Sequence, residues 1–304
     1  MRAIRALDFA MSPGQLGLFG GDVVKRDSAF QTCDLGAAEI YEFRQLIYLH
    51  YKHSGRMLPW RRTRDPYKIL VSELMLQQTQ VERALTKYEF FLKEFPDFSA
   101  LAKAPLKDVL AAWQGLGYNK RAIALKKIAE HVDNKLAGSL PSDYAALVEL
   151  PGIGPATACA VLTFAFDIPT VFIETNIRSV FLHVFFEGER DVRDEKIYPL
   201  VESTLDRSSP RTWYYALMDY GAMLKKRFSN PNRRSAYRKQ QAPFEGSNRQ
   251  LRGEIIALIL AYPAITEADL ARRLEADHEK ISRNLQKLEA EGFFKRVNAG
   301  FIVG

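Results

Sequence analysis

Two glutamates stand in local sequences that bias a carboxyl group in opposite directions. Glu73 is flanked by aliphatic residues, among them Val71 and Leu74, and apolar surroundings favour the neutral acid. Glu174 ends a Thr-Val-Phe-Ile run just before a predicted helix, where the helix dipole favours the carboxylate. A neutral acid combined with an ionised carboxylate suits cleavage of a glycosidic bond, since one donates a proton and the other faces a sugar cation.

Three polar residues, Gln77, Gln78 and Thr79, interrupt an otherwise apolar helical stretch shortly after Glu73. Hydrogen bonds to base edges, or insertion into the gap left by an extruded base, would explain such a cluster. The helix should begin with Asp65 as its cap and Pro66 at its first position, and it should break at the polar cluster.

A Pro-Gly-x-Gly turn lies between two apolar helical segments in the stretch from Leu147 to Arg178. Gly152 and Gly154 let the backbone turn sharply, and a helix from Pro155 would aim its first amide groups outward. Such a helix start suits a phosphate oxygen. The alternative is an ordinary helical hairpin.

Composition favours a globular protein with a polyanionic partner. Nearly half of the 304 residues are hydrophobic and the net charge is +7. The stretch from Lys225 to Arg249 holds eight Lys or Arg and one Glu, a net +7, so the rest of the chain sums to zero. Such concentrated charge favours nucleic acid, although many basic loops are only solvated. No apolar run is long enough to span a membrane.

Only two cysteines occur, Cys33 and Cys159. This number fits a reducing cytoplasm and excludes a four-cysteine iron–sulfur or zinc site within this chain. The five histidines show no metal-ligand spacing, so no metal site is expected.

Helical periodicity predicts an all-α core. We expect a poorly ordered extension over residues 1–36 and then helices at 37–52, 98–103, 106–114, 119–134, 177–186, 196–205 and 212–226. The expected domains are one lobe from 37–62 with 174–247, a six-helix module over 63–173, and a C-terminal domain over 248–304.

The C-terminal segment reads as helix, helix, helix and β-hairpin, with Thr266 capping its second helix and a turn at Asn298. This order is typical of a winged helix-turn-helix. Arg283 and Lys287 on the third helix favour DNA as its partner. A protein-contact module is the alternative.

The VSELMLQQTQV stretch, the Pro-Gly-Ile-Gly-Pro turn and the carboxylate about 20 residues after it resemble the helix-hairpin-helix (HhH-GPD) DNA glycosylases, most closely the MutY-type adenine glycosylases. The resemblance covers roughly residues 40–226 and implies a two-lobed helix-hairpin-helix core. It implies that Glu73 and Glu174 are catalytic, although the family has Asp at the second position.

The same resemblance implies further site residues. Pro59, Trp60 and Arg61 would line the approach to the active site, although Trp60 could equally be a core residue. The residues implied for the base pocket and for DNA intercalation are Arg61, Leu76, Gln77, Gln78, Thr79 and Tyr118. Those implied for the DNA backbone are Gly152, Gly154, Pro155, Ala156, Thr157, Arg121, Arg233, Arg234, Arg238 and Lys239.

Ala156 occupies the position where bifunctional relatives have a lysine that attacks the sugar, which implies an enzyme without lyase activity. Lys225 stands where the family's first cluster cysteine would be. We therefore expect no cofactor, apart from a monovalent cation that the hairpin is able to hold when DNA is bound. The family's Nudix-like C-terminal domain has no counterpart in the residues after 247.

The function implied is monofunctional base excision repair of duplex DNA, by a cytoplasmic, nucleoid-associated monomer that removes adenine mispaired with 8-oxoguanine or guanine. Two alternatives stay open: excision of another modified or mispaired base, and a non-catalytic DNA-binding regulator. Thr175 or Asn176 is expected to cap the helix after Glu174, which would free the Glu174 carboxylate to face the sugar. Asp219 is the acid to consider if Glu174 is not catalytic.

Overall fold

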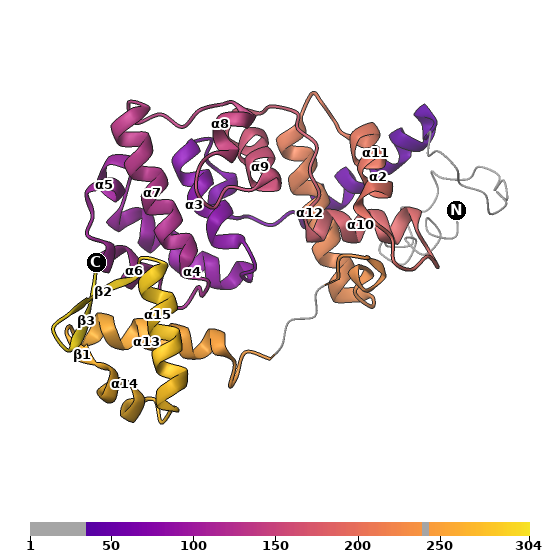
Figure 1. Ribbon diagram of the computed structural model, residues 1–304. Coiled ribbons are helices and arrows are strands. Elements are labelled where there is room, and N and C mark those ends of the chain that lie inside the picture. The colour runs from indigo at the N-terminus through magenta and orange to yellow at the C-terminus, as the bar shows by residue number, and fades with distance from the viewer. Residues whose placement is uncertain (1–34, 239–242) are drawn as a thin grey trace. The chain divides into compact units, whose positions relative to one another are not determined.

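A computed structural model describes residues 35–238 and 243–304 of the chain (Figure 1). The described residues form helices and one small sheet near the C-terminus. The predicted class, an all-α core followed by a winged helix, is confirmed. Nearly all of the predicted N-terminal extension lies outside the described residues.

The chain divides into two compact units. Among the described residues, one unit comprises 35–57 and 167–238, and the other comprises 58–166 and 243–304. These boundaries differ from the expected domains in one important respect, because the C-terminal segment groups with the six-helix module.

The first unit contains four helices and a short 3₁₀ turn within its described residues: α2 (Ala37–Ser54), α10 (Thr175–Phe185), α11 (Asp194–Thr204), α12 (Pro210–Arg227) and η4 (Pro231–Arg234). Its core is aromatic, since the Phe43 ring lies 5.5 Å from Phe181 and 5.8 Å from Trp213. Helices α10 and α12 approach very closely at Gly221, where a Cβ would lie 2.2 Å from the Asn176 carbonyl oxygen. Only glycine fits there.

The larger part of the second unit is the helical module, made of η3 (Pro59–Arg61), α3 (Pro66–Leu76), α4 (Val81–Glu94), α5 (Phe98–Lys103), α6 (Leu106–Trp113), α7 (Lys120–Lys135), α8 (Tyr144–Val148) and α9 (Pro155–Phe166). Helix α3 is central, because it packs against α4, α7 and α9. Most of its aliphatic residues are buried; Leu70, Val71 and Leu74 have no exposed surface.

The predicted start and end of α3 are confirmed. The Asp65 carboxylate accepts a hydrogen bond of 2.9 Å from the Tyr67 amide, and Pro66 is the first helical residue. The helix ends at Leu76, and α4 begins after a short loop. The seven core helices predicted by residue range have ends within two residues of those observed.

The C-terminal part of the second unit contains α13 (Asn248–Ala261), β1 (Ile265–Thr266), α14 (Glu267–Arg273), α15 (His278–Ala290), β2 (Phe294–Val297) and β3 (Gly300–Val303) (Figure 1). The strands form an antiparallel sheet in the order β1-β3-β2. The Thr266 cap is confirmed, since its hydroxyl accepts a hydrogen bond from the Asp269 amide. The turn at Asn298 is confirmed by its φ of 54°. The two-residue strand β1 was not predicted.

This winged helix packs on the helical module at the N-terminus of α7. The Lys120 ammonium lies 3.0 Å from the Glu291 carboxylate, and Arg252 pairs with the same carboxylate. An Arg249 N–H donates a hydrogen bond of 3.0 Å to the Tyr118 hydroxyl. Helix α13 also packs against α6. The winged helix therefore contacts a loop that the sequence assigned to the base pocket.

Candidate functional site

Glu73 lies on the partly exposed edge of α3. It is half-buried, whereas its neighbours Leu74 and Met75 are fully buried. Leu76 and Gln77 follow it by three and four residues, so they share its side of the helix, and both are half-buried. Glu73 is thus a carboxyl group set against an aliphatic core with one side accessible, as a proton donor to a ligand requires.

The polar cluster after α3 divides into three different environments. The Gln77 amide donates a hydrogen bond of 3.2 Å to the Thr157 hydroxyl on α9, so Gln77 links the end of α3 to the hairpin. The Thr79 hydroxyl accepts a bond of 3.0 Å from Arg121. Gln78 is exposed and has a φ of 56°, a backbone region that costs energy for residues with a side chain. Of the three, Gln78 is the most accessible to DNA.

Arg121 has an internal role instead of the predicted phosphate contact. It is 8% exposed, and its guanidinium donates to the carbonyls of Leu74 (2.8 Å), Met75 (2.9 Å) and Gly117 (2.8 Å), among others. Burial lowers its pKa to about 10. These bonds join the C-terminus of α3 to the loop before α7, so Arg121 positions the polar cluster from behind.

Tyr118 ends that loop in a left-handed conformation, with a φ of 47°. Its ring lies 5.5 Å from the Arg121 guanidinium carbon, and its hydroxyl accepts the bond from Arg249. The sequence identified Tyr118 but not Arg249, which is 131 residues away and has no local motif.

The segment from Pro59 to Arg61, which was expected to line the approach to the active site, contributes a core residue. Trp60 is 3% exposed and packs edge-on against Tyr88 with ring centroids 5.3 Å apart. The structure therefore supports the core alternative for Trp60, while Pro59 and Arg61 beside it are half-buried.

The predicted helical hairpin is present, formed by α8, a turn and α9. Gly152 has a φ of 82°, and a Cβ there would lie 2.9 Å from the Ala124 Cβ on α7. Gly154, Pro155 and Ala156 are exposed, whereas Ile153 is buried. The first turn of α9 is therefore accessible to an anion such as a phosphate.

Glu174 itself caps α10, contrary to the expectation that Thr175 or Asn176 would do so. Its Oε1 accepts bonds from the amides of Asn176 (2.7 Å) and Ile177 (2.8 Å), and its Oε2 accepts one of 3.0 Å from the Asn176 side chain. The longer glutamate reaches these amides, so the carboxylate is held at the helix N-terminus and is not free to extend.

Lys225 on α12 is a half-buried cation whose charge interacts with that of Glu174. Burial lowers the pKa of the Lys225 ammonium, while the negative charge of Glu174 opposes that shift. Asp219, the alternative acid, is 3% exposed and accepts hydrogen bonds from Arg56 at 2.6 and 2.8 Å. It is therefore tied to Arg56 in the core of the first unit.

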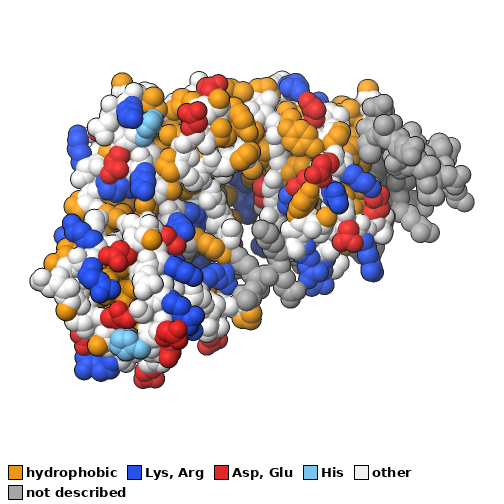
Figure 2. Space-filling model, in the orientation of Figure 1, with side chains coloured by type: hydrophobic (Ala, Val, Ile, Leu, Met, Phe, Trp, Pro, Cys, Tyr) orange, Lys and Arg blue, Asp and Glu red, His pale blue; other side chains and the backbone are white. Residues whose placement is uncertain are grey.

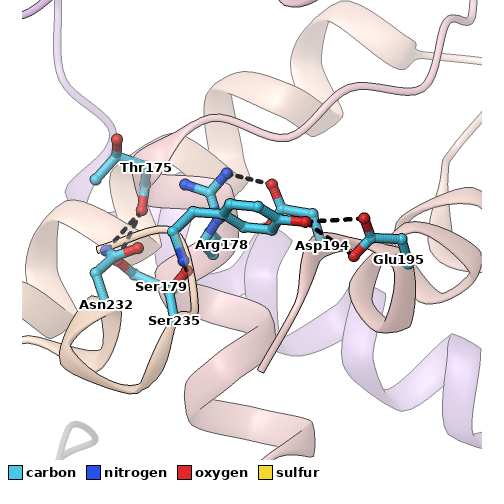
Figure 3. Close-up of polar contacts among 8 residues, drawn as sticks. Thr175, Arg178, Ser179, Asp194, Glu195, Asn232 and Ser235 are labelled. Carbon is cyan, nitrogen blue, oxygen red and sulfur yellow. Dashed lines mark hydrogen bonds and ion pairs between the residues drawn. The ribbon is translucent and has the colours of Figure 1, made fainter. Parts of the chain in front are cut away.

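The basic loop after α12 is held by hydrogen bonds (Figure 3). Asn232 donates a bond of 2.9 Å to the Thr175 carbonyl and another to the Ser179 hydroxyl. Val192 and Ser235 form a parallel β-bridge. These contacts anchor the loop to α10 and to the segment before α11.

The arginines of this loop differ in accessibility. Arg233 and Arg238 are exposed, as a phosphate contact requires. Arg234 is half-buried and donates a bond of 2.7 Å to the Phe186 carbonyl, and burial lowers its pKa. Arg234 therefore fixes the loop, contrary to its predicted role on DNA. Lys239 lies outside the described residues.

Within the described ranges, no group of three or more His, Cys, Asp or Glu residues could hold a metal ion. None of the helices within these ranges has both the length and the apolar character needed to cross a membrane.

Residues 71–204 match the family model described as HhH-GPD superfamily base excision DNA repair protein. The adenine DNA glycosylase of Buchnera aphidicola subsp. Baizongia pistaciae is 37% identical over 187 residues, which cover 60% of this chain and 52% of that protein. That of Mycolicibacterium smegmatis is 31% identical over 272 residues, covering 82% of this chain and 92% of that protein. The chain thus spans about half the length of the first relative.

Among solved structures, a thermostable thymine-DNA glycosylase matches with a TM-score of 0.55 and 26% identity, over 65% of this chain and 96% of that one. The H. pylori 3-methyladenine DNA glycosylase matches with a TM-score of 0.50 and 16% identity, over 62% and 97%. The second likeness supports the fold alone.

Proposed function

Because the chain belongs to the helix-hairpin-helix superfamily of base excision DNA repair proteins, we propose that it is a DNA glycosylase that removes adenine mispaired with 8-oxoguanine or guanine. The observation that carries this proposal is Glu73, a half-buried carboxyl group on the central helix of its unit, among fully buried aliphatic residues. A carboxyl in such a position has an obvious use in proton transfer and little use in packing.

In the proposed reaction, protonated Glu73 donates its proton to the leaving base as the bond between base and sugar breaks. The electron pair of that bond stays with the base, and the sugar becomes an oxocarbenium ion. The Glu174 carboxylate supplies the opposing negative charge. Water then adds to the sugar and passes a proton to the Glu73 carboxylate, which restores the protonated acid and leaves an abasic site and the free base.

We propose that this enzyme leaves the DNA strand intact. A lyase step needs an amine that attacks the sugar and forms a Schiff base, and the hairpin has Ala156 at the position where the family resemblance implies that amine in bifunctional relatives. Treatment with borohydride should therefore not trap the protein on DNA, and strand breaks should appear only after hot alkali.

We also propose that no iron–sulfur cluster is needed. The chain has two cysteines, fewer than the four that such a cluster uses, and hydrogen bonds from Asn232 and Arg234 hold the loop. The purified active protein should contain no stoichiometric iron and no visible absorption band.

The identity of the excised base is the most specific part of the proposal. The similarity to a thymine-DNA glycosylase makes a base other than adenine a real alternative. The decisive experiment incubates the purified protein with duplexes that differ only in the central pair, followed by alkali. Adenine opposite 8-oxoguanine or guanine should be excised fastest. If thymine or an alkylated base were excised faster, that base and not adenine would be the substrate. Tight binding without excision from any duplex would favour the regulator.

A further inference from the structure

A basic strip extends from the hairpin turn across α7 to α15, and the function proposed above makes no use of it. A depression of about 210 Å³ lies between these elements, and its lining residues are Lys120, Ile123, Ala124, Lys127, Pro151 and Glu291. Pro151 immediately precedes the hairpin glycine Gly152, so the depression borders the turn that is proposed to bind a phosphate.

The α15 side of the depression also carries lysines. Lys287 and Lys280 precede Glu291 by four and eleven residues, so all three lie on one side of the helix. Glu291 faces α7, since it pairs with Lys120. The side of α15 that adjoins the helical module therefore continues as a row of two lysines.

These lysines are available to an external anion. Lys127, Lys280 and Lys287 are exposed, and none of them has an ion-pair partner among the residues that the structure describes. Arg283 is different, because its guanidinium lies 3.8 Å from Glu279 on the preceding turn. Figure 2 shows Lys and Arg side chains mixed with acidic ones on this C-terminal part of the chain.

The spacing of the strip suits a nucleic acid backbone. Lys280 and Lys287 are about 10 Å apart along the helix axis at about 1.5 Å per residue, which corresponds to about three steps of one DNA strand at roughly 3.4 Å each. A row of unpaired ammonium groups with this spacing, next to a helix start open to phosphate, is complementary to a continuous polyanion.

We propose that the winged helix binds duplex DNA that flanks the damaged pair, with Lys127, Lys280 and Lys287 contacting the phosphates of the strand that leaves the hairpin. The Lys120–Glu291 ion pair and the Arg249–Tyr118 hydrogen bond join the winged helix to the N-terminal end of α7 and the loop before it, so this strip and the hairpin form one binding surface within the second unit. The inference rests on the proposed function only for its ligand, duplex DNA.

The test compares full-length variants on undamaged duplexes. Lys280→Ala/Lys287→Ala removes two exposed charges from the strip, and Lys93→Ala/Lys135→Ala removes two exposed charges from the C-terminal ends of α4 and α7. Fluorescence anisotropy at several salt concentrations gives the slope of log affinity against log salt. Two lost phosphate contacts should reduce the magnitude of that slope by about two units and weaken binding by about tenfold or more. The control should keep the native slope.

Duplex length provides a second readout. The native protein should bind a duplex of about 30 base pairs more tightly than one of about 12 base pairs, because only the longer one reaches the strip, and the strip variant should lose most of this difference. Circular dichroism establishes that each variant is folded. A strip variant with the native slope and native length dependence would overturn the inference.

The same experiment separates this inference from the proposed function. A changed slope in a protein that excises no base would support the binding surface and reject the glycosylase. Normal excision with an unchanged slope would support the glycosylase and reject the DNA-binding strip. A protein would then be the expected partner of the winged helix.

Discussion

The Glu174 carboxylate caps helix α10, and in the proposed reaction it also stabilises the oxocarbenium ion. Its two oxygens accept three hydrogen bonds from Asn176 and Ile177. These bonds orient the carboxylate before any substrate arrives, which is what electrostatic stabilisation of a transition state requires. The two tasks separate by substitution, because Asn and Asp are better N-cap residues than Glu.

Glu174→Asn should keep the thermal stability of the native protein while excision falls by about 10²–10³-fold, since the cap remains and the charge is lost. Glu174→Asp should also keep its stability, but its carboxylate is withdrawn by about 1.5 Å. That displacement should slow single-turnover excision about a hundredfold. Native excision by the Asn variant would remove Glu174 from the mechanism.

Arg121 is expected to act on stability and not on phosphate binding. Arg121→Met removes the guanidinium donor from the carbonyls of Leu74, Met75 and Gly117, which should lower the free energy of unfolding by about 2 kcal/mol or more. Urea denaturation measures this change, and the exposed Arg83→Ala is the matched control. If the Arg121→Met protein were as stable as the native protein and its DNA binding depended less on salt, the original prediction of a phosphate contact by Arg121 would be correct.

At the scale of elements, the two glycines of the hairpin turn have different roles. Gly152→Ala should destabilise the protein by about 1–2 kcal/mol, because its φ of 82° disfavours a side chain and its Cβ would crowd Ala124. Gly154→Ala should fold normally, because no described atom beyond the adjoining residues lies within 4 Å of its Cβ position.

Thermal denaturation checks the stability of both variants, and DNA binding checks the role of the turn. A folded Gly154→Ala variant should bind duplex more weakly, since the added methyl group hinders close approach of a phosphate. Equal stability of the two variants would contradict the structure of the turn.

The basic loop after α12 contains two exposed arginines and one structural arginine. Arg233→Ala/Arg238→Ala should reduce the magnitude of the salt dependence of duplex binding by about two units. Arg234→Ala should instead expose the loop to proteolysis, because it loses the bond to Phe186. An unchanged salt slope in the double variant would show that the loop does not contact DNA.

Sequence reasoning succeeded where the signal is local. The Asp65 cap, the end of α3 and the turn at Asn298 each depend on residues within a few positions of one another. It failed where partners are distant in the sequence, as for Arg121, whose carbonyl acceptors include one 47 residues away. Nothing in the local sequence distinguishes an arginine that binds carbonyls from one that binds phosphate.

Glu174 shows a different limit. Glutamate is a poor helix cap by propensity, so the sequence favoured Thr175 or Asn176. The structure reverses this choice, because the extended backbone of Glu174, with φ −113° and ψ 175°, directs its side chain back to the first amides of α10. The backbone conformation at Glu174 therefore determines which residue caps α10, and this conformation cannot be read from the residue types.

At the scale of the whole molecule, each compact unit carries one of the two proposed catalytic carboxyl groups. The second unit combines Glu73, the hairpin and the winged helix, and the first combines Glu174 with the basic loop. The proposed DNA contacts are thus distributed over several surfaces, whereas the proposed proton donation depends on one side chain. Glu73 is therefore the residue on which the account depends most.

The most direct test is single-turnover excision of adenine opposite 8-oxoguanine by the native protein and by Glu73→Gln, with duplex affinity measured in parallel. Glu89→Gln, an exposed change of the same kind on α4, is the matched control. Loss of a general acid should slow excision by about 10²–10⁴-fold, while DNA affinity and the control stay at native values. Excision by Glu73→Gln at the native rate would contradict the proposed glycosylase mechanism.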